Sequence, residues 1–208
     1  MDPVASSALV TAGAVAALLG AEHRGLRVGV WIAKPTASAG FVVVALAAGA
    51  TGSTYGSWIL AALLLCAAGD VLLIPRGRPS TFLAGALSFL VGHVLFVVAF
   101  LVRGVDPRLC ILGVVLASPP AILAIRWLRP NLSGSMRIVV YAYIGVISSM
   151  VVAAVGTAGG PIVLGASLFY LSDLAVARDR FIARSFWNGA WGLPLYYGAQ
   201  VLLASTAG

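Results

Sequence analysis

The sequence predicts an all-α, polytopic integral membrane protein: a bundle of eight transmembrane helices. Of its 208 residues, 61% are hydrophobic and only 9% are charged, whereas soluble domains carry about 25% charged residues. Apolar runs of about 18 or more residues recur along the chain, and each is long enough to cross a bilayer of roughly 30 Å. Because these runs leave no room for a separate soluble domain, we expect residues 1–208 to form a single transmembrane domain.

Turn-forming residues divide the apolar runs into eight spans. The first run follows Met-Asp-Pro without a basic segment, so we expect a retained helix and not a cleaved signal peptide. Charged residues, glycines and prolines separate later runs, at 22–25, 49–56, 75–79, 129–134 and 156–161. In order, the predicted spans are 4–21, 29–48, 57–74, 80–101, 108–128, 136–155, 160–177 and 185–205.

Positive charge alternates between the predicted turns. Only Arg103 and Arg108 lie on one side of the bundle. Ten arginines lie on the other: Arg24, Arg27, Arg76, Arg78, Arg126, Arg129, Arg137, Arg178, Arg180 and Arg184. Cytoplasmic loops are rich in Lys and Arg, so this bias predicts a multi-pass protein of the cytoplasmic membrane with both termini outside the cytoplasm. The net charge of +7 is dispersed over these turns, which does not indicate nucleic-acid binding.

Two aspartates interrupt the apolar runs, Asp70 in the third span and Asp173 in the seventh. An ionised carboxylate in the hydrocarbon layer costs roughly 2.5 kcal/mol or more, so each is a candidate functional residue. Both spans run inward and each aspartate precedes its cytoplasmic end by about four residues, which predicts a shared layer roughly 6 Å deep. The alternative, a structural pairing with Arg76 or Arg178, is disfavoured because the C-terminal end of a helix repels a carboxylate.

Further polar side chains reach the same predicted layer. Lys34 lies early in the second span, Tyr141 and Tyr143 in the sixth and Asn188 in the eighth. A lysine there would keep one aspartate ionised while the other stays protonated, as acid/base chemistry requires. The alternatives are that Lys34 extends to the headgroups and that Asn188 and the tyrosines only join helices.

His93 lies about thirteen residues into the fourth span, which predicts a position well below the aspartates. It is a candidate either for a polar cavity or for a buried neutral side chain. The sequence contains no HExxH motif and no GxSxG motif, which argues against a zinc hydrolase and a serine hydrolase. Cys66 and Cys110 fall in apolar segments and are expected to be core residues.

Short motifs along nearly the whole chain resemble the YhhN family of membrane lysoplasmalogenases. They are Lys34-Pro35, Gly69-Asp70, Phe89-x-x-Gly92-His93-x-x-Phe96, Gly165-Ala166-x-x-Phe169-x-x-Ser172-Asp173 and Tyr197-x-Ala199-Gln200. One departure is Phe96, where a tyrosine is expected in many members.

The resemblance implies an eight-helix hydrolase that cleaves the vinyl-ether bond of lysoplasmalogens to a fatty aldehyde and a glycerophospho-alcohol. It implies catalytic roles for Asp70 and Asp173, a lysophospholipid substrate drawn from membrane lipid, and no metal or organic cofactor. Lys34 or Arg178 is expected to hold the substrate phosphate, with His93, Tyr141 and Asn188 as further binding residues. The alternative is a proton-coupled transporter of a small solute or lipid that uses the same aspartates as a relay.

Overall fold

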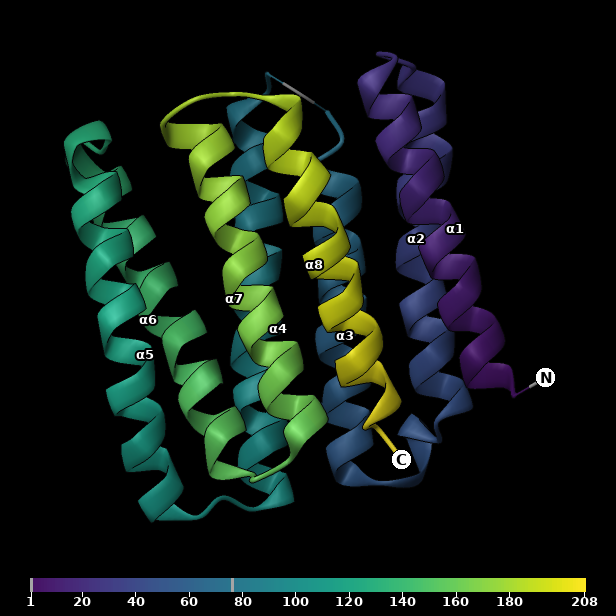
Figure 1. The fold of residues 1–208 in the computed structure, drawn as a ribbon, viewed down its shortest axis with the longest axis vertical. Coiled ribbons are helices and arrows are strands. Elements are labelled where there is room, and N and C mark those ends of the chain that lie inside the picture. Colours follow the sequence, from purple (N-terminus) through teal and green to yellow (C-terminus); the bar gives the residue numbers. More distant parts are fainter. Residues whose placement is uncertain (1, 76) are drawn as a thin grey trace.

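The computed structural model describes residues 2–75 and 77–208 and confirms the all-helical fold (Figure 1). Each helix end lies within four residues of its predicted position. The eight α-helices are α1 (Pro3–His23), α2 (Arg27–Ala47), α3 (Thr54–Leu72), α4 (Pro79–Arg103), α5 (Pro107–Leu128), α6 (Gly134–Gly156), α7 (Gly160–Phe181) and α8 (Phe186–Ser205). Two short 3-10 helices, η1 (Ala50–Gly52) and η2 (Arg129–Asn131), lie in the turns that follow α2 and α5.

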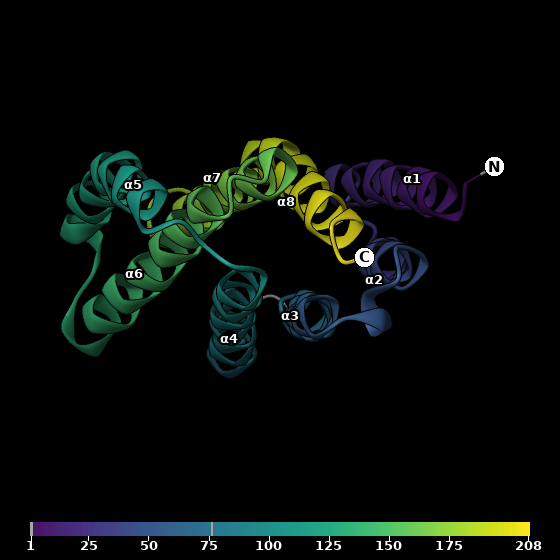
Figure 2. The ribbon, with the colours of Figure 1, turned by 90° about the horizontal axis from the view of Figure 1, so that it is seen from below.

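Six of the helices form a closed ring. In spatial order the ring runs α2, α3, α4, α6, α7 and α8, and α8 packs back against α2. Figure 2 shows this ring end-on, with α1 packed outside against α2 and α8, and α5 outside against α6. The order places α3 and α7, which carry the two aspartates, on different sides of the ring interior.

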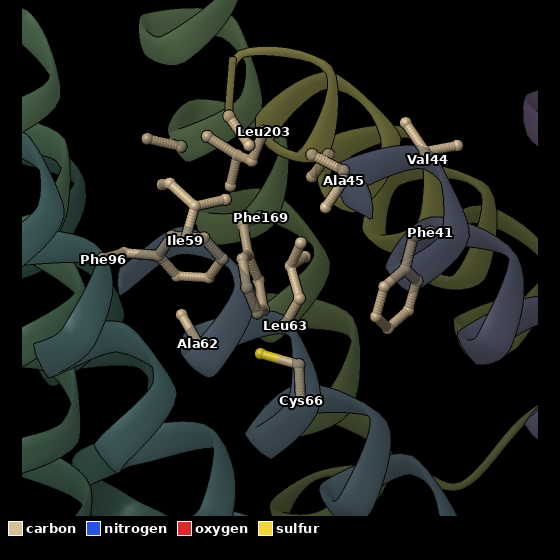
Figure 3. Close-up of a cluster of buried hydrophobic side chains, with 14 of the residues drawn as sticks. Phe41, Val44, Ala45, Ile59, Ala62, Leu63, Cys66, Phe96, Phe169 and Leu203 are labelled. Carbon is tan, nitrogen blue, oxygen red and sulfur yellow. The ribbon is translucent and has the colours of Figure 1, made fainter. Parts of the chain in front are cut away.

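An apolar cluster fills one half of the ring interior (Figure 3). We call it the ring core and define it by Phe41, Ile59, Leu63, Phe96, Phe169 and Leu203, all of which are fully buried. On every contributing helix these residues lie closer to the end that carries the chain termini than Asp70 and Asp173 do. The ring is therefore packed solid toward the termini, and the aspartates lie beyond the packed half.

Glycines allow the ring helices to approach one another closely. A Cβ atom at Gly69 of α3 would lie 2.7 Å from the Phe89 ring, and one at Gly92 of α4 would lie 3.1 Å from Cys66 Sγ. On the other side of the ring, a Cβ atom at Gly192 of α8 would lie 2.5 Å from Ala175. Small residues at such contacts are typical of transmembrane helix pairs, where close backbone packing replaces hydrophobic exclusion.

Seven helices, α1 to α7, are long and apolar enough to cross a membrane. The eighth, α8, has 20 residues and packs alongside them, but it does not reach the hydropathy required of a spanning helix. Four polar side chains of α8 are buried: Asn188, Tyr196, Tyr197 and Gln200. α8 therefore turns its polar side chains toward the protein interior.

Both chain termini lie at one end of the bundle (Figure 1). The turns 24–26, 129–133 and 182–185 and the turn between α3 and α4 lie at the opposite end, which we call the arginine-rich end. The described arginines follow the predicted division, with Arg103 and Arg108 alone at the terminal end. Arg76, which belongs to the predicted count, lies outside the described residues.

The orientation can be tested with cysteines placed in exposed turns at the two ends. In a Cys110→Ala background, a membrane-impermeant maleimide added to intact cells is expected to label Gly52→Cys at the terminal end. Ser133→Cys at the arginine-rich end is expected to react only after permeabilisation, and the buried Cys66 serves as an unreactive internal control. The reverse pattern would show that the arginine-rich end faces outward.

Candidate functional site

A cavity of about 890 Å³ lies toward the arginine-rich end and is lined mainly by the ring helices, with further residues from α1 and α5. Both Asp70 and Asp173 line it, together with Lys34, Tyr143 and Tyr196. A volume of this size is typical of a binding site for a small organic molecule. The two aspartates predicted from sequence to share a layer therefore share a cavity.

Asp70 is held by three side chains from two other helices. Its Oδ1 lies 3.4 Å from Lys34 Nζ, while its Oδ2 accepts hydrogen bonds from Ser38 Oγ at 2.7 Å and Tyr196 OH at 2.8 Å. Ser38 also lies 3.3 Å from the Tyr197 hydroxyl. A cation and two hydroxyl donors are the environment of an ionised carboxylate, and Asp70 is only 2% exposed.

Asp173 has a different environment. Its Oδ2 lies 3.6 Å from His93 Nε2, and the Tyr143 hydroxyl interacts with its carboxyl group. Among the described residues this Oδ2 has no hydrogen-bond partner, although it is buried. The side chain as a whole is 18% exposed, compared with 3% for Asp70. Asp173 is therefore the more accessible of the two carboxyl groups.

The tautomer of His93 follows from its second nitrogen. His93 Nδ1 lies 2.7 Å from the carbonyl oxygen of Phe89, which can only accept a hydrogen bond, so Nδ1 carries a hydrogen. In a neutral imidazole, Nε2 is then an acceptor that faces Asp173 Oδ2. Two lone pairs facing each other are repulsive, so one proton is expected to belong to this pair of side chains.

Packed aromatic rings connect the surroundings of the two carboxyl groups. The Tyr196 ring, whose hydroxyl binds Asp70, lies 5.4 Å from the Phe169 ring, and the Phe169 ring lies 4.4 Å from the ring of His93. Phe89 packs edge-on against Tyr196 at 5.8 Å. These rings fix the relative positions of the two aspartates without a polar contact between the carboxyl groups.

Asp173 lies deeper than the sequence predicted. Asp173 lies eight residues before the end of α7 at Phe181, roughly 12 Å, because the helix continues past the predicted boundary. Asp70 is close to the end of α3, but its partners Lys34 and Tyr196 lie seven and ten residues inside their own helices.

The predicted depth of His93 was wrong in the opposite sense. Sequence position placed it well below the aspartates, whereas it lies beside Asp173. Asp173 is deeper than predicted because α7 continues past its predicted boundary, and its side chain therefore reaches His93.

Asn188 and Arg178 join α7 to α8. Arg178 Nη1 donates to Asn188 Oδ1, and Asn188 Nδ2 donates to Asp179 Oδ1 at 2.9 Å and to the Ala183 carbonyl at 2.8 Å. Asn188 also lines the cavity. A role for these two residues in binding a ligand stays a prediction, but their polar groups already have protein partners.

Tyr141 and Tyr143 point in different directions, as residues two apart on a helix do. Tyr141 packs with a second apolar cluster that includes Ala124, Leu128 and Leu132. Tyr143 lines the cavity beside Asp173 and lies 5.5 Å from the His93 ring. A binding role for Tyr141 stays a prediction, while the geometry favours Tyr143.

Ser38 and Tyr196 are site residues that the sequence did not predict. Ser38 follows Lys34 by one helical turn, so the two share a helix face, a spacing that could have identified it. Tyr196 forms a Tyr-Tyr pair with Tyr197 in a span predicted to be apolar, which is a weaker signal. In the described part of the chain, no group of three His, Cys, Asp or Glu side chains is arranged to hold a metal ion.

Comparison with known proteins extends over most of the chain. The sequence model of the YhhN family matches residues 29–207. Lysoplasmalogenase TMEM86A of Bos taurus is 35% identical over 159 residues, which cover 72% of this chain and 64% of that protein. Lysoplasmalogenase TMEM86B of Sus scrofa is 31% identical over 78% of this chain and 69% of that protein. Lysoplasmalogenase TMEM86B of Mus musculus is 33% identical over 80% of this chain and 70% of that protein.

The chain thus spans just under two thirds of the length of the bovine relative. No solved structure matches the chain. The names of these relatives describe hydrolases and give no support to the transporter alternative.

The junction of α7 and α8 yields a stability prediction. Asn188→Ala is expected to lower the free energy of unfolding by about 1–3 kcal/mol, because it removes the hydrogen bonds by which Asn188 joins Arg178, Asp179 and Ala183. Thermal unfolding in detergent measures the effect. Asn131→Ala, at an exposed position in η2, is the matched control and is expected to change little; equal stability of the two variants would contradict a structural role.

Proposed function

The chain belongs to the YhhN family, and from that premise we propose that it hydrolyses the vinyl-ether bond of lysoplasmalogens, releasing a fatty aldehyde and a glycerophospho-alcohol. The names of its relatives support this substrate class. The observation that carries the proposal is that two carboxyl groups with different partners line one cavity in the membrane-spanning part of the protein. We place the protein in the cytoplasmic membrane, with the cavity toward the cytoplasm.

Vinyl-ether hydrolysis begins with protonation of the β-carbon of the double bond. We assign this proton to Asp173, because the His93 tautomer leaves one proton to the Asp173–His93 pair and a neutral pair avoids two buried charges. Asp173 is also the carboxyl group more open to the cavity. Protonation turns the vinyl ether into an oxocarbenium ion and leaves Asp173 ionised.

Asp70 is proposed to act on the second half of the reaction. Lys34, Ser38 and Tyr196 stabilise its ionised form, which suits a group that stabilises a cation and accepts a proton from water. Water adds to the oxocarbenium carbon and gives one proton to Asp70, which forms a hemiacetal. The same division of roles between two carboxyl groups occurs in glycoside hydrolysis, whose transition state is also oxocarbenium-like.

Collapse of the hemiacetal regenerates both groups. Its hydroxyl proton returns to Asp173 while the proton on Asp70 passes to the leaving oxygen, so the carbon–oxygen bond breaks and the aldehyde forms. The sum is one water consumed, one alcohol and one aldehyde released, and both aspartates back in their starting states. This cycle needs no redox partner.

Substitution of the aspartates tests the site. Asp70→Asn and Asp173→Asn are each expected to lower aldehyde release from purified protein and lysoplasmalogen by at least about 100-fold, the usual contribution of a positioned acid or base. Asp106→Asn is the matched control, because Asp106 only caps α5 and asparagine caps helices equally well. Unchanged turnover in both site variants would remove them from the mechanism.

His93 is expected to act as a positioning residue for Asp173. His93→Ala should lower kcat about 10- to 100-fold with little change in KM, because the proton loses the acceptor that holds it toward the substrate. His93→Gln, whose side chain can offer an amide oxygen to Asp173, should recover part of kcat. Equal kcat in the two variants would indicate that His93 is only a packing residue.

A further inference from the structure

We propose that the apolar branch of the cavity binds the hydrocarbon chain of a single-chain lipid, which reaches it sideways from the bilayer between α4 and α6. The inference rests on the proposed function and specifies how its substrate is held. We call this part the chain branch and define it by Ala124 and Leu128 of α5, Met136, Val140 and Ile144 of α6, and Leu174 of α7, which all line the cavity.

One face of α6 forms a continuous wall of this branch. The cavity-lining residues on it recur at helical spacing from Met136 through Val140 and Ile144 to Ile147. They span eleven positions, roughly 16 Å along the helix. A long apolar strip of this kind matches an extended hydrocarbon chain better than a compact polar solute.

The chain branch begins at the proposed acid. Leu174 follows Asp173 directly on α7, and Ile144 follows Tyr143 directly on α6; all four residues line the same cavity. A chain lying in the branch would therefore place the bond at its head beside the Asp173 carboxyl group. A vinyl ether lies at this junction in a lysoplasmalogen, between the hydrocarbon chain and the polar glycerol.

The branch is open to the surroundings of the helices. Leu83 of α4 and Val139 of α6 both line the cavity, yet they are 43% and 38% exposed. α4 and α6 are neighbours in the ring and both are apolar enough to span a membrane. Residues that face a cavity on one side and the bilayer on the other mark an opening through which a lipid can pass.

Arginines that suit a phosphate headgroup also line the cavity. Arg180 and Arg184 line it at the arginine-rich end, and the Arg180 guanidinium is held 4.2 Å above the Phe82 ring. Asp179 also lines the cavity, but its Oδ1 already accepts hydrogen bonds from Ser185 and Asn188. Apolar walls and arginines in one cavity complement an anionic lipid with a single chain.

A photoreactive lipid tests the proposal directly. The probe is a lysophospholipid with a saturated alkyl-ether chain and a diazirine near the chain end, added to the full-length protein in vesicles. Labelling is expected within residues 121–147, at the end of α5 and the first half of α6. Ala124→Trp should fill the branch and lower this labelling at least five-fold, while Leu123→Trp, on the lipid-facing side of the same helix, should leave it unchanged.

Labelling confined to lipid-facing residues, or equally strong in the two variants, would overturn the chain branch. Ala124→Leu replaces Ala124→Trp if the larger side chain prevents folding. Because the probe has no vinyl ether, labelling tests the branch independently of catalysis. Aldehyde release without labelling of the branch would refute only this inference, whereas labelling without aldehyde release would refute only the proposed function.

Discussion

The arrangement of this protein depends on burying the Asp70 carboxyl group among membrane-spanning helices. A charge in that position is tolerated only with a cation and hydrogen-bond donors around it, and removal of one partner from a buried pair costs about 3–5 kcal/mol. Lys34 and Ser38 come from α2 and Tyr196 from α8, so the requirement fixes both helices against α3. These three helices close one side of the ring, and α1 packs against two of them.

The interior of the helix ring is packed unevenly, and the less packed half holds the candidate site. The ring core packs the half near the termini mainly with apolar side chains, while the other half keeps a cavity. Phe169 belongs to the ring core and also contacts His93 and Tyr196. Its side chain therefore supports a neighbour of each aspartate. The two carboxyl groups differ in environment, with a lysine beside Asp70 and a histidine beside Asp173, and this difference is the basis of the opposite roles proposed for them.

Much of the fold could be predicted from the sequence, because length and apolarity determine where a chain can cross a bilayer. Asp70 and Asp173 were identifiable for the same reason, as costly groups in apolar runs. Ser38, Tyr196 and the contact between His93 and Asp173 depend instead on which helices are neighbours in the ring, which hydropathy does not encode. The depth of Asp173 was missed because the charged residues after it continue α7, stabilised by contacts to α8 such as that between Arg178 and Asn188.

The packed half of the ring also bears on where the proposed reaction exchanges protons. The ring core lies between the cavity and the terminal end, whereas arginines of the opposite end line the cavity. In the proposed reaction, protons taken up or released at Asp173 and Asp70 would therefore exchange with one compartment alone. Such a reaction would move no charge across the membrane and would neither use nor dissipate the proton-motive force.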